Sequence, residues 1–450
     1  MDTALAILVI GIIIFVSHWF SGIFERYGIP DVLLLMMIGL LVGPVLGVVS
    51  PADFGITAPM FTTLTLVFIL FEGGLGLKLN DLKEAIGGSA SITTINFFVT
   101  MIVVGALGYF IFRLDLPAAL ALGAILGGTS SAVVIPMVRQ IQLTEESRTI
   151  LILESAISDV LCIVFALALM DASLSGEVKV GQIIGKILSS FIIASIMGIL
   201  GAFIWAILLN RIRTIKNSIF TTPAFVFVVY AVAEQLGYSG AIAALLFGIT
   251  LANIEQFSFA FLKRYIEQKP ISLNETERIF MSEVVFLFKS MFFIYIGISM
   301  QFGNITDLLL SLLVTAVVFA LRVPVSAAST SSHIPLADKS IMAIMVPKGL
   351  AAAVLASIPV QMGVPGGETI KNVTYAVVLF SIIFTSILAP LVTRNRAVGV
   401  FYGWLVRASM FWRRTPATAA VQANSSQEVS PQHENPTTTD ENNNAESSNS

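Results

Sequence analysis

Charged residues are scarce in this sequence. Asp, Glu, Lys and Arg make up 12% of its 450 residues, whereas a soluble globular domain averages about 25%. Hydrophobic residues make up 56% of the chain. This composition excludes an ordinary soluble enzyme, a nucleic-acid-binding protein and a disordered protein. The net charge of −3 adds little, so the informative question is where the few ionisable side chains lie.

Cysteine and histidine are almost absent as well. The single cysteine, Cys162, excludes a disulfide framework and a cysteine-based metal cluster. The three histidines, His18, His333 and His433, are too few and too scattered for a histidine metal site. We expect no catalytic residues and no bound cofactor.

Long apolar runs are abundant instead. A transmembrane helix needs about 20 mostly apolar residues, and thirteen stretches predict such helices. They cover residues 4–24, 31–49, 58–77, 89–112, 117–138, 149–170, 182–209, 219–236, 239–252, 280–301, 307–332, 340–363 and 370–392. No Lys or Arg precedes the first stretch and no small-residue cleavage site follows it, so we expect it to stay in the membrane. The predicted fold is an all-α polytopic membrane protein.

The basic residues predict how the chain is oriented in the membrane. With the N-terminus outside, 18 of the 25 Lys and Arg residues fall on the cytoplasmic side and 3 fall outside. This bias predicts an external N-terminus, a cytoplasmic C-terminus and an odd number of spans. The membrane domain is expected to cover residues 1–397. Residues 398–414 are short, aromatic and basic at their end, which predicts an interfacial helix. Residues 415–450 are polar and predict a disordered cytoplasmic tail.

Nine charged residues remain within the predicted spans once those at the first or second position of a span are set aside. They are Glu72, Glu154, Asp159, Lys186, Glu234, Glu283, Lys289, Arg322 and Lys348. An ionisable group at the bilayer centre costs at least ~2.5–3.5 kcal/mol, so such residues usually serve ion pathways, proton relays or ion pairs. Lys289 and Glu283 are six residues apart and are not expected to share a helix face.

The sixth stretch holds the densest polar group, Glu154-Ser-Ala-Ile-Ser-Asp159. Ser155 and Asp159 are spaced i and i+4, so they share one helix face, and Glu154 and Ser158 share the next. Carboxylate and hydroxyl oxygens suit a small alkali cation. The alternative is a packing face whose serines bond to helix carbonyls. Two carboxylates in mid-membrane favour the ion-binding hypothesis.

Two stretches contain residues that interrupt a helix. The fifth reads GAILGGTSSAVVIP (123–136), and the twelfth contains Val346-Pro-Lys-Gly-Leu350. Broken backbone at membrane depth lines protein cavities, and its carbonyls coordinate ions. A small-residue packing face is the alternative for the fifth stretch. Breaks in stretches five and twelve predict two inverted six-helix repeats with broken crossing helices.

Together these features resemble the monovalent cation/proton antiporter family, most closely the archaeal and bacterial sodium/proton antiporters. The resemblance covers about residues 5–395. The motifs that carry it are LLLMMIGLLVGP (33–44), LFEGGL (70–75), GAILGGTSSAVV (123–134), ESAISD (154–159), FKSMFFIYIGISM (288–300), Arg322-Val-Pro and VPKGLAAAV (346–354).

The resemblance implies a role for the residues of the sixth stretch. Asp159 matches the aspartate that binds the ion and the proton, and Arg322 matches the arginine that pairs with the glutamate at Glu154 in a structural role. The residue before the aspartate is Asn in electroneutral members and Asp in electrogenic members. Ser158 departs from both patterns.

The resemblance also implies roles for residues on neighbouring stretches. Thr129-Ser130 stands where the family usually carries Thr-Asp, so a second carboxylate is missing. Lys348 matches a basic residue, usually arginine, and is a candidate for charge balance. Glu72 falls where relatives place an acid near the ion path; the alternative is a boundary residue at a helix end.

These residues predict a transporter that exchanges sodium or lithium for protons, one for one, by alternating access. Asp159, Ser155 and Thr129 are the predicted Na⁺ ligands, with Glu72, Ser158 and Ser130 as further candidates. Potassium/proton exchange is an alternative within the family, and a passive cation channel is an alternative of another class. An organic-anion symporter and an intramembrane protease fit the charges less well. The resemblance implies a homodimer. We expect a protein of the plasma membrane that contacts lipid, monovalent cations and protons, binds no nucleic acid and contributes to pH homeostasis.

Overall fold

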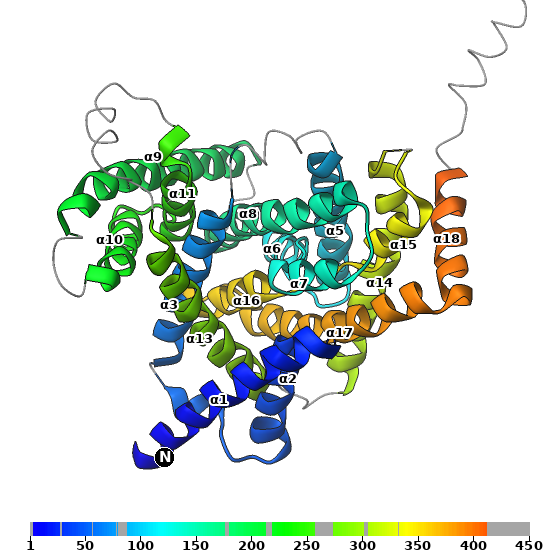
Figure 1. The fold of residues 1–450 in the computed structure, drawn as a ribbon, viewed down its shortest axis with the longest axis horizontal. Helices are drawn as coiled ribbons and strands as arrows, with labels where there is room; N and C mark the ends of the chain where they lie inside the picture. Colours follow the sequence, from blue (N-terminus) through cyan, green and yellow to red (C-terminus); the bar gives the residue numbers. More distant parts are fainter. Residues whose placement is uncertain are drawn as a thin grey trace, which may run out of the picture.

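The computed structural model describes residues 3–27, 29–55, 57–77, 79, 88–175, 180–212, 218–256, 273–300, 305–331 and 333–411. Over these residues every regular element is a helix, as predicted, and Figure 1 shows long and short helices packed side by side. The predicted tail, residues 415–450, lies outside the described residues.

Seven helices in the described part of the chain have the length and composition of membrane spans. They are α3 (Thr57–Gly76), α5 (Gly88–Phe110), α8 (Glu145–Ser175), α9 (Val180–Ile212), α13 (Glu275–Ser299), α14 (Ile305–Ser329) and α17 (Gly367–Arg394). Their apolar windows have mean hydropathies from 1.6 to 2.6.

The other predicted ranges lie on α1 (Thr3–Tyr27), which has 25 residues, and on shorter or interrupted helices. The shorter or interrupted helices are α2 (Asp31–Leu40) with a π-helical turn at Leu41–Val45, α6 (Leu116–Ile125), α7 (Ser131–Gln140), α10 (Thr221–Gln235), α11 (Gly240–Ala252), α15 (Leu336–Ile344) and α16 (Leu350–Met362). Three short 3₁₀ turns lie at Pro51–Phe54, Ser218–Phe220 and Ile254–Gln256. The count of thirteen spans therefore stays a prediction.

The predicted interfacial segment falls on α18 (Arg396–Phe411). Val406 is buried on this helix, whereas Phe401 and Trp404 are 55% and 61% exposed. Val406 packs with residues of α14 and α15. Its position at a membrane surface stays a prediction.

The helices pack as two bundles. The first, here called the flanking bundle, contains α1, α2, α3, α9, α10, α11 and α13, with α3 and α9 on either side of α11 and α2 against α13. The second, the crossover bundle, contains α5, α6, α7, α8, α14, α15, α16 and α17. In Figure 1 α9, α10 and α11 lie on one side of the molecule, and α5, α14 and α15 lie on the other.

Glycines bring the helices of the flanking bundle into close contact. A Cβ on Gly39 of α2 would collide with the Ile294 carbonyl of α13, and a Cβ on Gly74 of α3 would collide with the Leu245 carbonyl of α11. In a membrane the hydrophobic effect does not drive helices together, so helix association depends on close packing. Small residues allow this because the helix backbones can approach closely. The flanking bundle is therefore tightly packed at both of these crossings.

The two breaks predicted in the crossing helices are present in the structure. The non-helical residues 126–130 separate α6 from α7, and residues 345–349 separate α15 from α16. The Ser130 amide donates a hydrogen bond to the Pro347 carbonyl at 2.7 Å, so the two non-helical segments meet. This pairing satisfies backbone groups that a helix would otherwise satisfy. The inverted repeat that the breaks suggested stays a prediction.

Candidate ion-binding site

The break between α6 and α7 lies against the middle of α8. Gly127 and Gly128 have low helix propensity, which helps to end α6 before them. A Cβ on Gly128 would lie 2.7 Å from the Cys162 sulfur. Glycine leaves room for this close approach, so the break brings the backbone directly to the polar face of α8.

Asp159 and Ser131 make a direct contact at this crossing. The Ser131 hydroxyl donates a hydrogen bond to Asp159 Oδ2 at 3.0 Å. Ser131 is the first residue of α7, where the positive end of the helix dipole favours a negative charge. Asp159 is half-buried and lines a cavity of about 720 Å³ together with Ser130 and Ser131. A carboxylate beside hydroxyls offers the hard oxygen ligands that alkali cations accept.

The opposite wall of this cavity comes from the flanking bundle. Glu72 of α3 lines it, and so do Ser282 and Lys289 of α13. Arg278 of α13 also lines the cavity, as does Arg139 of α7 from the crossover bundle, and both arginines are exposed. The cavity therefore lies between the two bundles, with Asp159 on one wall and Glu72 on the other.

The remaining polar side chains of α8 are engaged within the protein. The Ser155 hydroxyl donates to the Ile152 carbonyl at 2.8 Å. The Ser158 hydroxyl donates to the Ser155 carbonyl and accepts the Thr129 amide, each at 3.1 Å. None of Ser155, Ser158 and Thr129 lines the cavity. Among the predicted Na⁺ ligands Asp159, Ser155 and Thr129, Asp159 alone faces it.

Ser130 and Ser131 divide the roles at the start of α7. The Ser130 hydroxyl is buried without a hydrogen-bond partner among the described residues. Ser131 is not among the site residues predicted from the sequence, yet its hydroxyl donates the hydrogen bond to Asp159. The sequence indicates Ser131 only as part of the run of three hydroxyl residues at 129–131. Which of these hydroxyl groups points at Asp159 depends on where α7 begins.

Lys348 sits inside the crossing and is fully buried. Its Nζ donates to the Gly128 carbonyl at 2.7 Å, and its backbone amide donates to the Ser381 hydroxyl at 2.9 Å. Gly128 follows the C-terminal end of α6, where a cation is favourable. Lys348 thus ties the two broken segments together and places a positive charge beside the carbonyls of the first.

Glu154 and Arg322 form an ion pair in the core of the crossover bundle. The two terminal nitrogens of the Arg322 guanidinium each donate to one oxygen of the Glu154 carboxylate. The Arg322 side chain is 0% exposed and the Glu154 side chain is 1% exposed. Arg322 Nε also donates to the Met342 carbonyl at 3.0 Å. The contact that the resemblance implied is present, and it links α8, α14 and α15. Glu154 does not line the cavity.

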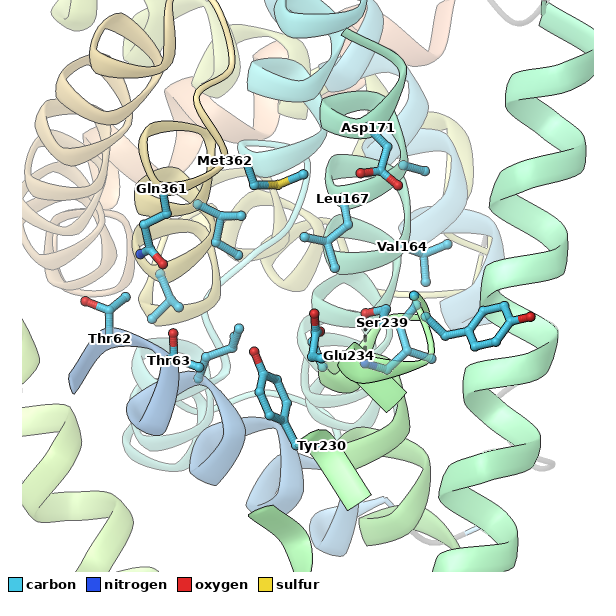
Figure 2. Close-up of a pocket in the computed structure, with 18 residues that line it drawn as sticks. Thr62, Thr63, Val164, Leu167, Asp171, Tyr230, Glu234, Ser239, Gln361 and Met362 are labelled. Carbon is cyan, nitrogen blue, oxygen red and sulfur yellow. Dashed lines mark hydrogen bonds between the residues drawn. The ribbon is translucent and has the colours of Figure 1, made fainter. Parts of the chain in front are cut away.

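A second cavity of about 370 Å³ lies farther along α8. Figure 2 shows Asp171, Tyr230, Glu234 and Gln361 around it. Glu234 Oε1 accepts the Gly240 amide at 2.8 Å. Asp171 is twelve residues beyond Asp159 on the same helix, about 18 Å along its axis. Asp159 lines the first cavity and not this one, so the two cavities reach α8 at different heights.

A family model described as "Sodium/hydrogen exchanger, transmembrane" matches residues 11–394. The K(+)/H(+) antiporter NhaP2 of Shewanella sp. (strain ANA-3) is 24% identical over 383 residues, covering 82% of this chain and 63% of the relative. The K(+)/H(+) antiporter NhaP of Alkalimonas amylolytica is 26% identical over 393 residues, covering 84% and 65%. The chain thus spans less than two thirds of the length of these relatives.

A sequence relative and a solved structure come from the same archaeal organism. The Na(+)/H(+) antiporter 1 of Methanocaldococcus jannaschii is 30% identical over 171 residues, covering 36% of this chain and 39% of the relative. The solved structure of the sodium proton antiporter MjNhaP1 from the same organism at pH 8 has a TM-score of 0.68 and 20% identity. It covers 86% of this chain and 100% of the solved chain, so the two share a fold.

Proposed function

This chain belongs to the sodium/hydrogen exchanger family, and we propose that it exchanges a monovalent cation for protons across the membrane. The observation that carries the proposal is the bond between Ser131 and Asp159 at a broken helix, on the wall of a cavity between two bundles. The exchanged ions are substrates, and no resident cofactor is needed for this reaction.

The proposed mechanism is competition for Asp159. Ionised, this carboxylate binds a cation with the Ser131 hydroxyl; protonated, it is neutral and releases the cation. Either loaded form is close to neutral, whereas an empty carboxylate is costly to move through apolar surroundings. Alternating access would connect Asp159 first to the cavity of Glu72 and then to the cavity of Glu234.

We propose electroneutral exchange of one cation for one proton. Asp159 is followed by Val160 and preceded by Ser158, so it has no neighbouring acid on α8. Glu154, the other acid of this group, is held by Arg322 and does not face the cavity. One carboxylate that carries either one proton or one monovalent cation moves no net charge.

Sodium or lithium is the proposed cation, because a carboxylate and hydroxyls make a tight oxygen site. Potassium is a second candidate, and it is favoured by the K(+)/H(+) antiporters that match more than four fifths of this chain. Cation selectivity depends on cavity size and ligand flexibility, so transport itself must separate the three ions.

The test is a pH-gradient assay in proteoliposomes with sodium, lithium and potassium compared side by side. We expect cation-driven proton flux that vanishes in Asp159→Asn, with little response to an imposed voltage. Because the proton competes for the same carboxylate, the half-saturating cation concentration should rise as pH falls. Cation flux without proton counter-transport would instead identify a passive channel.

We further propose the membrane context of this activity. The chain would lie in the plasma membrane with its N-terminus outside and its C-terminus in the cytoplasm, because its basic residues cluster in alternate loops. It would act as a homodimer and contribute to pH homeostasis. Protease accessibility of tags placed at the two ends would test the orientation.

A further inference from the structure

A second ion pair lies beside the cavity, on the wall opposite Asp159. Lys289 Nζ of α13 donates a hydrogen bond to Asp31 Oδ2 of α2 at 3.2 Å. The Asp31 side chain is 6% exposed and the Lys289 side chain is 18% exposed. Lys289 lines the cavity, whereas Asp31 does not. Lys289 therefore borders the cavity while its ammonium group is bonded to a buried carboxylate outside the cavity lining.

Both partners are held in place by their surroundings. Asp31 is the first residue of α2, where the positive helix end stabilises its charge. A Cβ on Gly297 of α13 would collide with the Met36 carbonyl of α2, and one on Gly43 would lie 2.7 Å from Ile298 Cα. These contacts allow the two helices little relative movement. The Lys289 Nζ also lies 5.3 Å from the centre of the Phe286 ring, which favours a cation there.

Lys289 of α13 and Glu72 of α3 line the same cavity, and opposite charges within one cavity attract each other. Arg278, Met281, Ser282, Val285 and Lys289 form one helix face towards the cavity, at the spacing of successive helical turns. A cation that enters the cavity therefore meets two carboxylates, Asp159 and Glu72, and the Lys289 ammonium group, besides the exposed guanidinium groups of Arg139 and Arg278. The ammonium group competes with it for Glu72 and repels it from the whole cavity.

We propose that Lys289 sets the cation affinity of the transport site, and that Asp31 limits this effect by holding the ammonium group back. The positive charge of Lys289 offsets the negative charge of Glu72, so that Glu72 does not serve as a cation ligand. Asp159 is then the one carboxylate that exchanges a cation for a proton. This proposal rests on the proposed cation/proton exchange and assigns it an affinity-determining residue on the flanking bundle. Lys289 acts on the cation through its charge and need not touch it.

The two halves of the pair should shift cation affinity in opposite directions. Lys289→Met removes the competing charge, so the half-saturating cation concentration should fall by roughly three- to tenfold. Asp31→Asn removes the restraining carboxylate and leaves the ammonium group to act on the cavity, so that concentration should rise. A pair that served only to brace α2 against α13 would lower protein yield and maximal rate in both variants and leave the half-saturating concentration unchanged.

The experiment measures half-saturating concentration and maximal rate in proteoliposomes that contain the full chain, for wild type, Lys289→Met, Lys289→Arg and Asp31→Asn. Lys289→Arg keeps the charge and should match wild type. Lys371→Met is the matched control, because Lys371 pairs with Glu368 on α17 and does not line the cavity. Melting temperatures in detergent report stability separately.

Opposite shifts in Lys289→Met and Asp31→Asn support the proposal. An unchanged or higher half-saturating concentration in Lys289→Met overturns it, even if Asp31→Asn is too unstable to purify. The proposed function is judged separately by the wild type: absence of cation-driven proton flux there defeats the function, whereas normal wild-type flux with unshifted variants defeats only this inference.

Discussion

Arg322 of α14 contacts Glu154 of α8 with both of its terminal nitrogens, and the side chains are at most 1% exposed. A buried pair of this kind adds little net stability relative to an apolar core, but its loss on one side leaves an uncompensated charge. The pair lies in the core of the crossover bundle and away from the cavity wall. Its contribution should therefore be to folding more than to ion binding.

Glu154→Gln should destabilise the protein by about 3–5 kcal/mol, because it leaves the Arg322 guanidinium buried and unpaired. We expect a lower melting temperature and a lower yield of purified protein, with little change in half-saturating cation concentration for the protein that folds. Glu154→Gln combined with Arg322→Met removes both charges and should recover much of the stability. A single variant as stable as wild type would contradict the structural role.

Asp159→Asn should abolish cation-dependent proton flux while the protein remains folded. The amide is close in shape to the carboxylate and accepts the Ser131 hydrogen bond through its oxygen, but it carries neither a cation nor a proton at neutral pH. The measurement is flux in proteoliposomes together with size-exclusion profile and melting temperature. Glu368→Gln, which changes an exposed acid on α17, is the control and should transport normally. Wild-type flux in Asp159→Asn would remove Asp159 from the mechanism.

The all-helical fold and its breaks could be predicted because they follow from local chemistry. Apolar run length predicts helices, and Gly127-Gly128 and Pro347 with Gly349 indicate where they are interrupted. The motif pattern also predicted a resemblance to cation/proton antiporters, which the family match confirms. Spans shorter than a full bilayer crossing, such as α11, carry a weaker local signal, so their number could not be fixed in this way.

The candidate site was predicted less completely, because its contacts depend on the directions of individual side chains. The spacing of Ser155 and Asp159 on α8 suggested a shared ligand, but the Ser155 hydroxyl bonds to the Ile152 carbonyl. The pairing of Asp31 with Lys289 could not be predicted from the sequence. Asp31 is the first residue of its helix, and its partner lies 258 positions away. No periodicity within one helix reports such a pair.

Ser131→Ala should weaken cation binding more than Ser155→Ala. Loss of the hydroxyl beside Asp159 removes one hydrogen bond to the carboxylate and one cation ligand, which at about 1 kcal/mol corresponds to a roughly fivefold higher half-saturating concentration. Ser155→Ala removes a bond to a helix carbonyl and should leave that concentration within about twofold of wild type. Half-saturating concentrations measured for the two variants under identical conditions decide between them. A larger effect in Ser155→Ala would favour the ligand set that the sequence predicts, Asp159, Ser155 and Thr129.

Gly349→Ala should disrupt the crossing of the two broken helices. The added Cβ would collide with the Cβ and Oγ of Ser130, in the same segment whose amide bonds to the Pro347 carbonyl. Gly349 has a φ of −140°, outside the left-handed region that favours glycine, so the expected effect comes from the collision with Ser130. We expect a lower melting temperature and loss of most of the transport rate. Gly73→Ala is the control, because Gly73 lines the cavity of Asp159 and a Cβ added there would meet nothing within 4 Å.

A second substitution at Ser130 separates the collision from any other effect of Gly349→Ala. Ser130→Ala keeps the Cβ that collides, so Gly349→Ala with Ser130→Ala should remain impaired. Ser130→Gly removes that Cβ and the hydroxyl, so Gly349→Ala with Ser130→Gly should regain stability and part of the transport rate. If both double variants behave alike, the contact between Gly349 and Ser130 does not limit the crossing.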